Sequence, residues 1–125
     1  MRAFKVLLYL PLEATIMLER DVVKSIMNML KKEYPGFWFK THGGPFQIAG
    51  LPDILGCHKG KFIGIEVKLP GKEKNLTQKQ KDIINKINLA GGIAFMATSA
   101  EYTRRRLHEK FRKTPTIPRR TRRSV

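Results

Sequence analysis

The stretch from Pro52 to Lys68 reads PDILGCHKGKFIGIEVK, and it decides the fold. Both of its halves are rich in apolar and β-branched residues, and the dipeptide Lys59-Gly60 stands between them as a two-residue turn. The stretch therefore predicts a β-hairpin whose strands span residues 53–58 and 61–69.

A two-residue turn also fixes which residues of the two strands face each other. The numbers of each facing pair sum to 119, which places Asp53 directly opposite Glu66. Because side chains alternate along a strand, Lys68 stands on the same face as both carboxylates. The opposite face of this strand is apolar and carries Ile63, Ile65 and Val67.

Two facing carboxylates need a physical reason. Their β-carbons lie about 5 Å apart, and two unit charges at that distance repel each other by about 3 kcal/mol at an effective dielectric constant of 20. Mg²⁺ or Mn²⁺ would remove this repulsion, since these ions prefer carboxylate oxygens, water and phosphate as ligands. A lysine beside the ion favours phosphodiester hydrolysis.

Helices and further strands flank the hairpin. Thr77 and Gln80 form a capping box at the start of one predicted helix, and Ser99 caps another. The predicted order is α, β, β, β, α, β, α, which is an α/β fold with a mixed central sheet flanked by helices. The elements outside the hairpin are expected at residues 19–34, 37–40, 77–89, 93–98 and 99–111.

Positive charge dominates the composition. Lys and Arg total 25 against 10 Asp and Glu, which gives a formal net charge of +15 at pH 7. Residues 104–125 contain ten of these bases and one acid, so the rest of the chain retains 15 bases against nine acids. Both parts favour a polyanion as partner, and nucleic acid fits better than an anionic membrane or a merely solubilising tail.

The length of 125 residues suits one domain. We expect an N-terminal extension over residues 1–16, the domain over residues 17–112 and a basic C-terminal extension over residues 113–125. A lone cysteine, Cys57, excludes an internal disulfide and a cysteine-based zinc cluster, which favours the cytoplasm. The apolar run near the start is too short to span a bilayer and lacks a cleavage site.

Pro52-Asp53, twelve intervening residues and Glu66-Val67-Lys68 resemble the motif of the PD-(D/E)xK nuclease superfamily. The context strengthens this resemblance, because the second half of the motif ends a predicted strand, Gln80 opens the next helix and Glu19 begins the first one. The whole set is similar to the VRR-Nuc branch, a stand-alone domain of phages and bacteria. The similarity covers about residues 17–98.

The resemblance implies a restriction-endonuclease-like αβββαβ core, dependence on Mg²⁺ or Mn²⁺, and cleavage of Holliday junctions, flaps or other branched DNA. It also implies a homodimer in a bacterial or phage-infected cell; we expect neither a membrane partner nor an organic cofactor. By matched position it assigns Asp53, Glu66, the Val67 carbonyl and Glu19 to the metal. The implied catalytic set is Glu19, Asp53, Glu66, Lys68 and Gln80.

Several basic residues are candidates for contacts with DNA phosphates, although a solvated surface also explains them. They follow the second hairpin strand, open the next helix or lie in the last helix: Lys72, Lys74, Lys79, Lys81, Arg104, Arg105 and Arg106. Other residues have ordinary explanations. His42 and His58 are expected to be exposed, Cys57 to be buried, and Trp38 with its neighbouring Phe residues to lie in the core or in a dimer contact.

Two alternatives remain open for the site. Glu19 is also explained as a favourable charge at a helix N-terminus, and Gln80 as a capping residue alone. Two alternatives remain for the function as well. One is a non-catalytic DNA-binding module on the same fold, and the other is a nicking or restriction-type nuclease.

Overall fold

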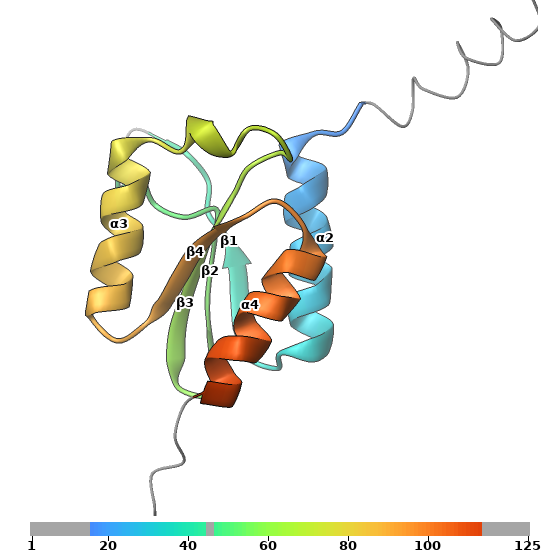
Figure 1. Ribbon diagram of the computed structural model, residues 1–125, viewed down its shortest axis with the longest axis vertical. Coiled ribbons are helices and arrows are strands. Elements are labelled where there is room, and N and C mark those ends of the chain that lie inside the picture. The colour runs from blue at the N-terminus through green and yellow to red at the C-terminus, as the bar shows by residue number, and fades with distance from the viewer. Residues whose placement is uncertain (1–15, 45–46, 114–125) are drawn as a thin grey trace, which may run out of the picture.

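A computed structural model describes residues 16–44 and 47–113, and shows a four-stranded sheet between two helical layers (Figure 1). The elements are α2 (Glu19–Glu33), β1 (Phe37–Lys40), β2 (Ile54–His58), β3 (Lys61–Val67), the short 3-10 helix η1 (Glu73–Asn75), α3 (Gln78–Leu89), β4 (Ile93–Ala97) and α4 (Ala100–Lys113). The predicted mixed α/β fold with helices flanking the sheet is confirmed. Most of the two predicted extensions lies outside the described residues.

The sheet has the order β1-β2-β3-β4. β1 pairs with β2 and β2 with β3 in antiparallel fashion, whereas β3 and β4 are parallel. Lys59 and Gly60 have positive φ angles of 50° and 79°, which identify the two-residue turn that suits the twist of a hairpin. Ile54 pairs with Ile65, so the predicted register is confirmed.

Helices α2 and α4 cover one face of the sheet and bury the main hydrophobic core (Figure 1). α2 contributes every third or fourth residue, as an amphipathic helix does, and the strands contribute alternate residues. Among its members are Val22, Ile26 and Leu30 of α2, Ile63, Ile65 and Val67 of β3, and Leu107 of α4. No helix of the described residues is long and apolar enough to cross a membrane.

Helix α3 covers the other face, and only on the side of β3 and β4. A β-carbon at Gly64 would lie 3.1 Å from Ile87 of α3, so the helix packs closely there. Beyond the helix, Phe37 and Phe39 of the edge strand β1 and Phe62 at the turn end of β3 are exposed. Cys57 is also exposed, which contradicts the expectation of a buried cysteine, because it lies between Phe37 and Phe62 on this uncovered part.

His58 is buried, although an exposed turn histidine was expected. It ends β2 with its ring on the α2 and α4 face, where the rings of Tyr34 and Phe111 meet it edge to face. Its Nδ1 lies 2.7 Å from the carbonyl oxygen of Pro35. His42 is exposed, as expected.

Trp38 belongs to the core, whereas its neighbours Phe37 and Phe39 do not. Its indole N–H donates to the carbonyl oxygen of Tyr34 at 2.8 Å. Gly56 makes room for the ring, because a β-carbon there would lie 2.3 Å from an indole carbon. The choice left open for Trp38 is thereby decided in favour of the core.

Some element boundaries differ from the sequence prediction. The second hairpin strand ends at Val67 rather than at residue 69, and α4 continues past Phe111 to Lys113. The short 3-10 helix η1 was not predicted. It lies in the loop between β3 and α3, where the Lys72 carbonyl accepts a hydrogen bond from the backbone N–H of Asn75. These differences leave the order of the elements unchanged.

We expect Leu107→Ala to lower the free energy of unfolding by about 2 to 5 kcal/mol, because this side chain is completely buried and its loss leaves a cavity. Leu89→Ala is the matched control, since Leu89 is 88% exposed, and it should change stability by less than about 0.5 kcal/mol. Urea unfolding measures both. Equal losses would contradict the packing of α4 described above.

Candidate active site

Asp53 and Glu66 meet at the end of the hairpin opposite the turn. Asp53 directly precedes β2, and Glu66 is the last residue but one of β3. The β2/β3 register continues from Ile54 and Ile65 to these two residues. One carboxylate oxygen of Asp53, Oδ2, accepts the backbone N–H of Val67 at 2.8 Å, which draws Asp53 against β3.

The carboxylate of Glu66 is buried and only partly satisfied. Glu66 is 3% exposed. Its Oε2 accepts a hydrogen bond from Nε2 of Gln80 at 2.9 Å and lies 3.7 Å from Nζ of Lys68. When Glu66 is ionised, its Oε1 is buried without a hydrogen-bond partner among the described residues; when Glu66 is protonated, its carboxyl group shares a hydrogen bond with Asp53. A buried oxygen of this kind costs free energy unless another group binds it.

The surroundings of Glu66 favour its neutral form. Its pKa is raised from 4.5 to about 8, first by burial, then by the negative charge of Asp53 and by a side-chain hydrogen bond with Asp53. Lys68 lowers this pKa, and Glu19 adds a small increase. A divalent cation at the same place would reverse the balance, because it favours the ionised carboxylate.

Lys68 follows directly after β3, and its side chain is 13% exposed. Its backbone N–H donates to the carbonyl oxygen of Ala97, which holds the end of β3 against β4. Its ammonium group is therefore placed beside Glu66 by the sheet itself. The predicted grouping of Asp53, Glu66 and Lys68 on one face agrees with these contacts.

Gln80 both caps α3 and contacts the site. Its side-chain Oε1 accepts a hydrogen bond from the backbone N–H of Thr77, and its backbone N–H donates to the Thr77 hydroxyl, which completes the capping box. Its side-chain Nε2–H group donates to Oε2 of Glu66. The two explanations offered by the sequence are therefore compatible, since different atoms of one side chain serve them.

Thr41 is a residue of the site that the sequence reasoning missed. Its hydroxyl donates to the carbonyl oxygens of Pro52 and Asp53 at 2.9 and 3.2 Å. Its backbone N–H also donates to the carbonyl oxygen of Asp53, at 2.8 Å. These contacts fix the backbone that carries the Asp53 carboxylate. The signal was weak, because the register of β1 against β2 is not fixed by a short turn.

Glu19 lies at the exposed N-terminus of α2. Its charge contributes to the raised pKa of Glu66. However, no three His, Cys, Asp or Glu side chains of the described residues converge as a metal site. The structure therefore brings Asp53 and Glu66 together and leaves Glu19 at the rim, where its predicted contact with a metal stays a prediction.

The candidate DNA contacts fall into two groups. Lys72, Lys74, Lys79 and Lys81 are exposed in the loop after Lys68 and in the first turn of α3, beside Gln80. The arginines lie in α4 and contact the protein itself. Arg104 pairs with Glu33 and Glu101, which raises its pKa, and Arg106 lies over the ring of Phe95 at 4.6 Å.

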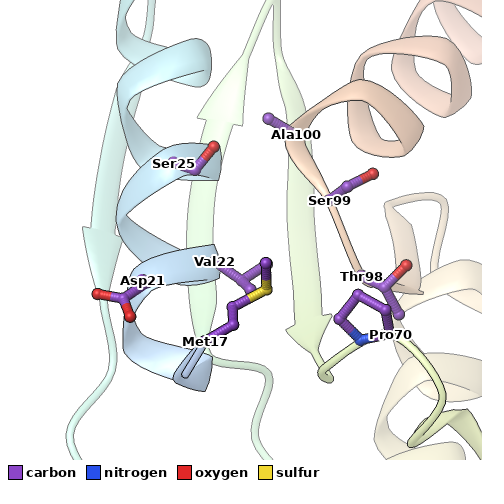
Figure 2. Close-up of a pocket in the computed structure, with 8 residues that line it drawn as sticks. All are labelled: Met17, Asp21, Val22, Ser25, Pro70, Thr98, Ser99 and Ala100. Atoms are coloured by element: carbon purple, nitrogen blue, oxygen red, sulfur yellow. The ribbon is translucent and has the colours of Figure 1, made fainter. Parts of the chain in front are cut away.

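A cavity of about 230 Å³ lies near the carboxyl ends of β3 and β4, between α2 and the start of α4 (Figure 2). Met17, Val22, Pro70 and Ala100 make most of its lining apolar. Asp21, its one charged residue, accepts the backbone N–H of Leu18 with its carboxylate. This cavity therefore lacks the cationic groups that a phosphate needs.

The donors at the hairpin end fit a hard divalent cation. Oε1 of the ionised Glu66 has no partner among the described residues, the Asp53 carboxylate lies beside it, and the Val67 carbonyl belongs to the same strand end. Mg²⁺ is commonly held by one or two carboxylates while water and substrate phosphate complete its ligands. Two carboxylates with a neighbouring lysine are therefore chemically compatible with metal-assisted hydrolysis of a phosphate ester.

We expect Glu66→Gln to stabilise the metal-free protein more at pH 8 than at pH 5. The unfolded chain ionises Glu66 near its ordinary pKa of 4.5, whereas the folded chain does so near 8, so the wild type loses stability as pH rises through this window. The difference between variant and wild type should grow by about 2 to 4 kcal/mol from pH 5 to pH 8. Urea unfolding in EDTA measures it, with Glu73→Gln as the exposed control.

No family model matches the chain, and no curated protein matches it in sequence. The functional argument therefore rests on the residues at the hairpin end: a buried carboxylate with one unpartnered oxygen, a second carboxylate facing it, and a lysine and a glutamine in contact range. Together they form a candidate metal-dependent hydrolytic site.

Proposed function

We propose that the chain is a metal-dependent endonuclease that hydrolyses DNA phosphodiester bonds at Asp53 and Glu66. The observation that carries this proposal is the buried pair of facing carboxylates, in which Glu66 hydrogen-bonds Asp53 when protonated and, once ionised, keeps one oxygen without a partner among the described residues. A purely structural glutamate would be expected to have both oxygens bonded or exposed. The arrangement makes sense when a cation binds between the two acids.

The residues around the carboxylates prepare them for this task. The N–H of Val67 orients Asp53, and the amide of Gln80 orients Glu66. Each of these contacts uses only one oxygen of its carboxylate. A bound Mg²⁺ or Mn²⁺ would polarise the phosphate and lower the pKa of an attacking water.

Lys68 supplies the positive charge next to the reacting phosphate. Because the Lys68 backbone is bonded to β4 and its side chain is mostly buried, the ammonium group is held near one position. There it orients the attacking water and offsets the negative charge that grows on the phosphate as the P–O bond breaks. This preorganised charge contributes to the rate without any rearrangement of the site.

DNA is the substrate that the charge of the chain favours. The net charge of +15 attracts a polyanion, and the exposed Lys72 and Lys74 extend the positive surface from Lys68 toward α3. The order αβββαβ of the described elements agrees with the restriction-endonuclease-like core that the resemblance to VRR-Nuc domains implies. That resemblance supports branched DNA, such as Holliday junctions or flaps, as the preferred form.

We expect wild-type protein to cleave labelled DNA with Mg²⁺ or Mn²⁺ and not with EDTA. Asp53→Asn and Lys68→Ala should each lower the cleavage rate at least about 100-fold, the scale on which one electrostatic contact to the transition state acts. Lys86→Ala, an exposed lysine near the end of α3, is the control and should cleave normally. A four-way junction, a flap and a linear duplex show which form is preferred.

The same experiment separates a nuclease from a binding module. Metal-dependent cleavage that survives in both site variants would place the reaction elsewhere. Tight DNA binding without cleavage under any metal would favour the non-catalytic alternative. Equal cleavage of linear and branched DNA would favour a nicking or restriction-type enzyme.

Metal binding itself should stabilise the wild type. At a metal concentration of about 100 times the Kd, a cation that binds only the folded state adds about 2.7 kcal/mol. Mn²⁺ should therefore raise the melting temperature of the wild type in the absence of DNA, but not that of Asp53→Asn. Glu73→Gln, which changes an exposed acid of η1, should keep the full increase.

A further inference from the structure

A basic groove, distinct from the carboxylate site, lies along the outer side of α2 and reaches the end of β1. It encloses about 480 Å³ and is lined by Arg20, Lys24, Asn28 and Lys31 of α2 and by Lys40 of β1. Figure 1 shows α2 next to β1, and the two elements are in contact. Four cations and one amide thus share one depression of the surface.

The cations of this groove are free to bind a partner. Arg20, Lys24, Lys31 and Lys40 are exposed, and none of them forms an ion pair within the described residues. The one acid of the groove, Asp21, accepts the backbone N–H of Leu18 at the start of α2. The arginines of α4 differ, since Arg104 is paired with two glutamates.

The spacing of these residues suits an extended chain of anions rather than one small ion. On the helix they follow at steps of four, four and three residues, which keeps them on one side. From Arg20 to Lys31 the axis rises by about 16 Å. Each step along the groove is comparable to the distance between successive phosphates of a nucleic-acid strand.

One end of the groove adjoins the candidate active site. Arg20 follows Glu19, whose charge is felt at Glu66. Lys40 pairs with Ile54, the neighbour of Asp53, and Thr41 beside it bonds the Asp53 backbone. The basic groove therefore begins beside the end of the hairpin that carries the carboxylates and leads away from it along α2.

We infer that the basic groove binds the phosphate backbone of the DNA arm next to the cleaved bond. This inference rests on the proposed function for the identity of the partner, but binding is measured separately from cleavage. Phosphate contacts of this kind position a substrate and do not read its sequence. The groove therefore contributes affinity and orientation for any DNA sequence.

The test compares two triple variants with the same loss of charge. Lys24→Gln, Lys31→Gln and Lys40→Gln remove the lysines of the groove, whereas Lys32→Gln, Lys59→Gln and Lys86→Gln remove exposed lysines outside it. Binding of the full chain to a labelled linear duplex and a four-way junction is measured in EDTA over a salt series. Circular dichroism confirms that both variants fold.

Each lost phosphate contact should reduce the magnitude of the negative slope of log K against log salt concentration by about 1. We expect a decrease of about 3 for the groove variant, with weaker binding to every DNA sequence, and of less than about 1 for the control variant. Equal decreases would show that net charge alone matters and would overturn the groove. Binding to phosphatidylserine vesicles is measured for the same variants. If the groove variant lost vesicle binding while its DNA binding stayed unchanged, the groove would be a membrane contact and the inference would be overturned.

The two proposals fail in different ways. Absence of metal-dependent cleavage by the wild type, with the groove effect intact, would overturn the nuclease and support the groove as a nucleic-acid surface. Normal cleavage and normal DNA binding by the groove variant would overturn the groove and leave the nuclease in place.

Discussion

The opposition of Asp53 and Glu66 across the hairpin is the constraint on which the rest of the site depends. It follows from the two-residue turn, because a loop one residue longer would move one of the two strands out of register and separate the acids. The repulsion between the acids is then built into the sheet. Gln80, Lys68 and the N–H of Val67 are arranged around this pair and hold both carboxylates in place.

The two faces of the sheet divide stability from chemistry. On the face of α2 and α4, alternate strand residues such as Ile63, Ile65 and Val67 are completely buried among apolar side chains. On the face of α3, glycine at position 64 brings the helix close, and Glu66 is buried within reach of the helix N-terminus. Burial of this one acid lowers stability at neutral pH, which the large apolar face offsets.

The sequence predicted the fold well because its signals were local. A turn of two residues fixes the register of the hairpin, and a capping box fixes the start of α3, so both were confirmed. The pairing of Asp53 with Glu66 followed from the register alone. Gln80 was also identified, although its contact with Glu66 depends on how α3 packs against the sheet.

Contacts between segments that are far apart in the sequence were decided only by the tertiary structure, because no short turn fixes how such segments pair. Thr41 became part of the site through the β1/β2 register. Cys57 is exposed because α3 covers only part of its face, and His58 is buried because Tyr34 and Phe111 pack against it on the other face. Likewise, the basic groove joins α2 to Lys40 only after the sheet has formed. The sequence by itself determined the register of the hairpin and the charge of the chain. The burial of His58, the exposure of Cys57 and the contacts between distant residues depend on how the helices pack on the sheet, which the local sequence pattern does not encode.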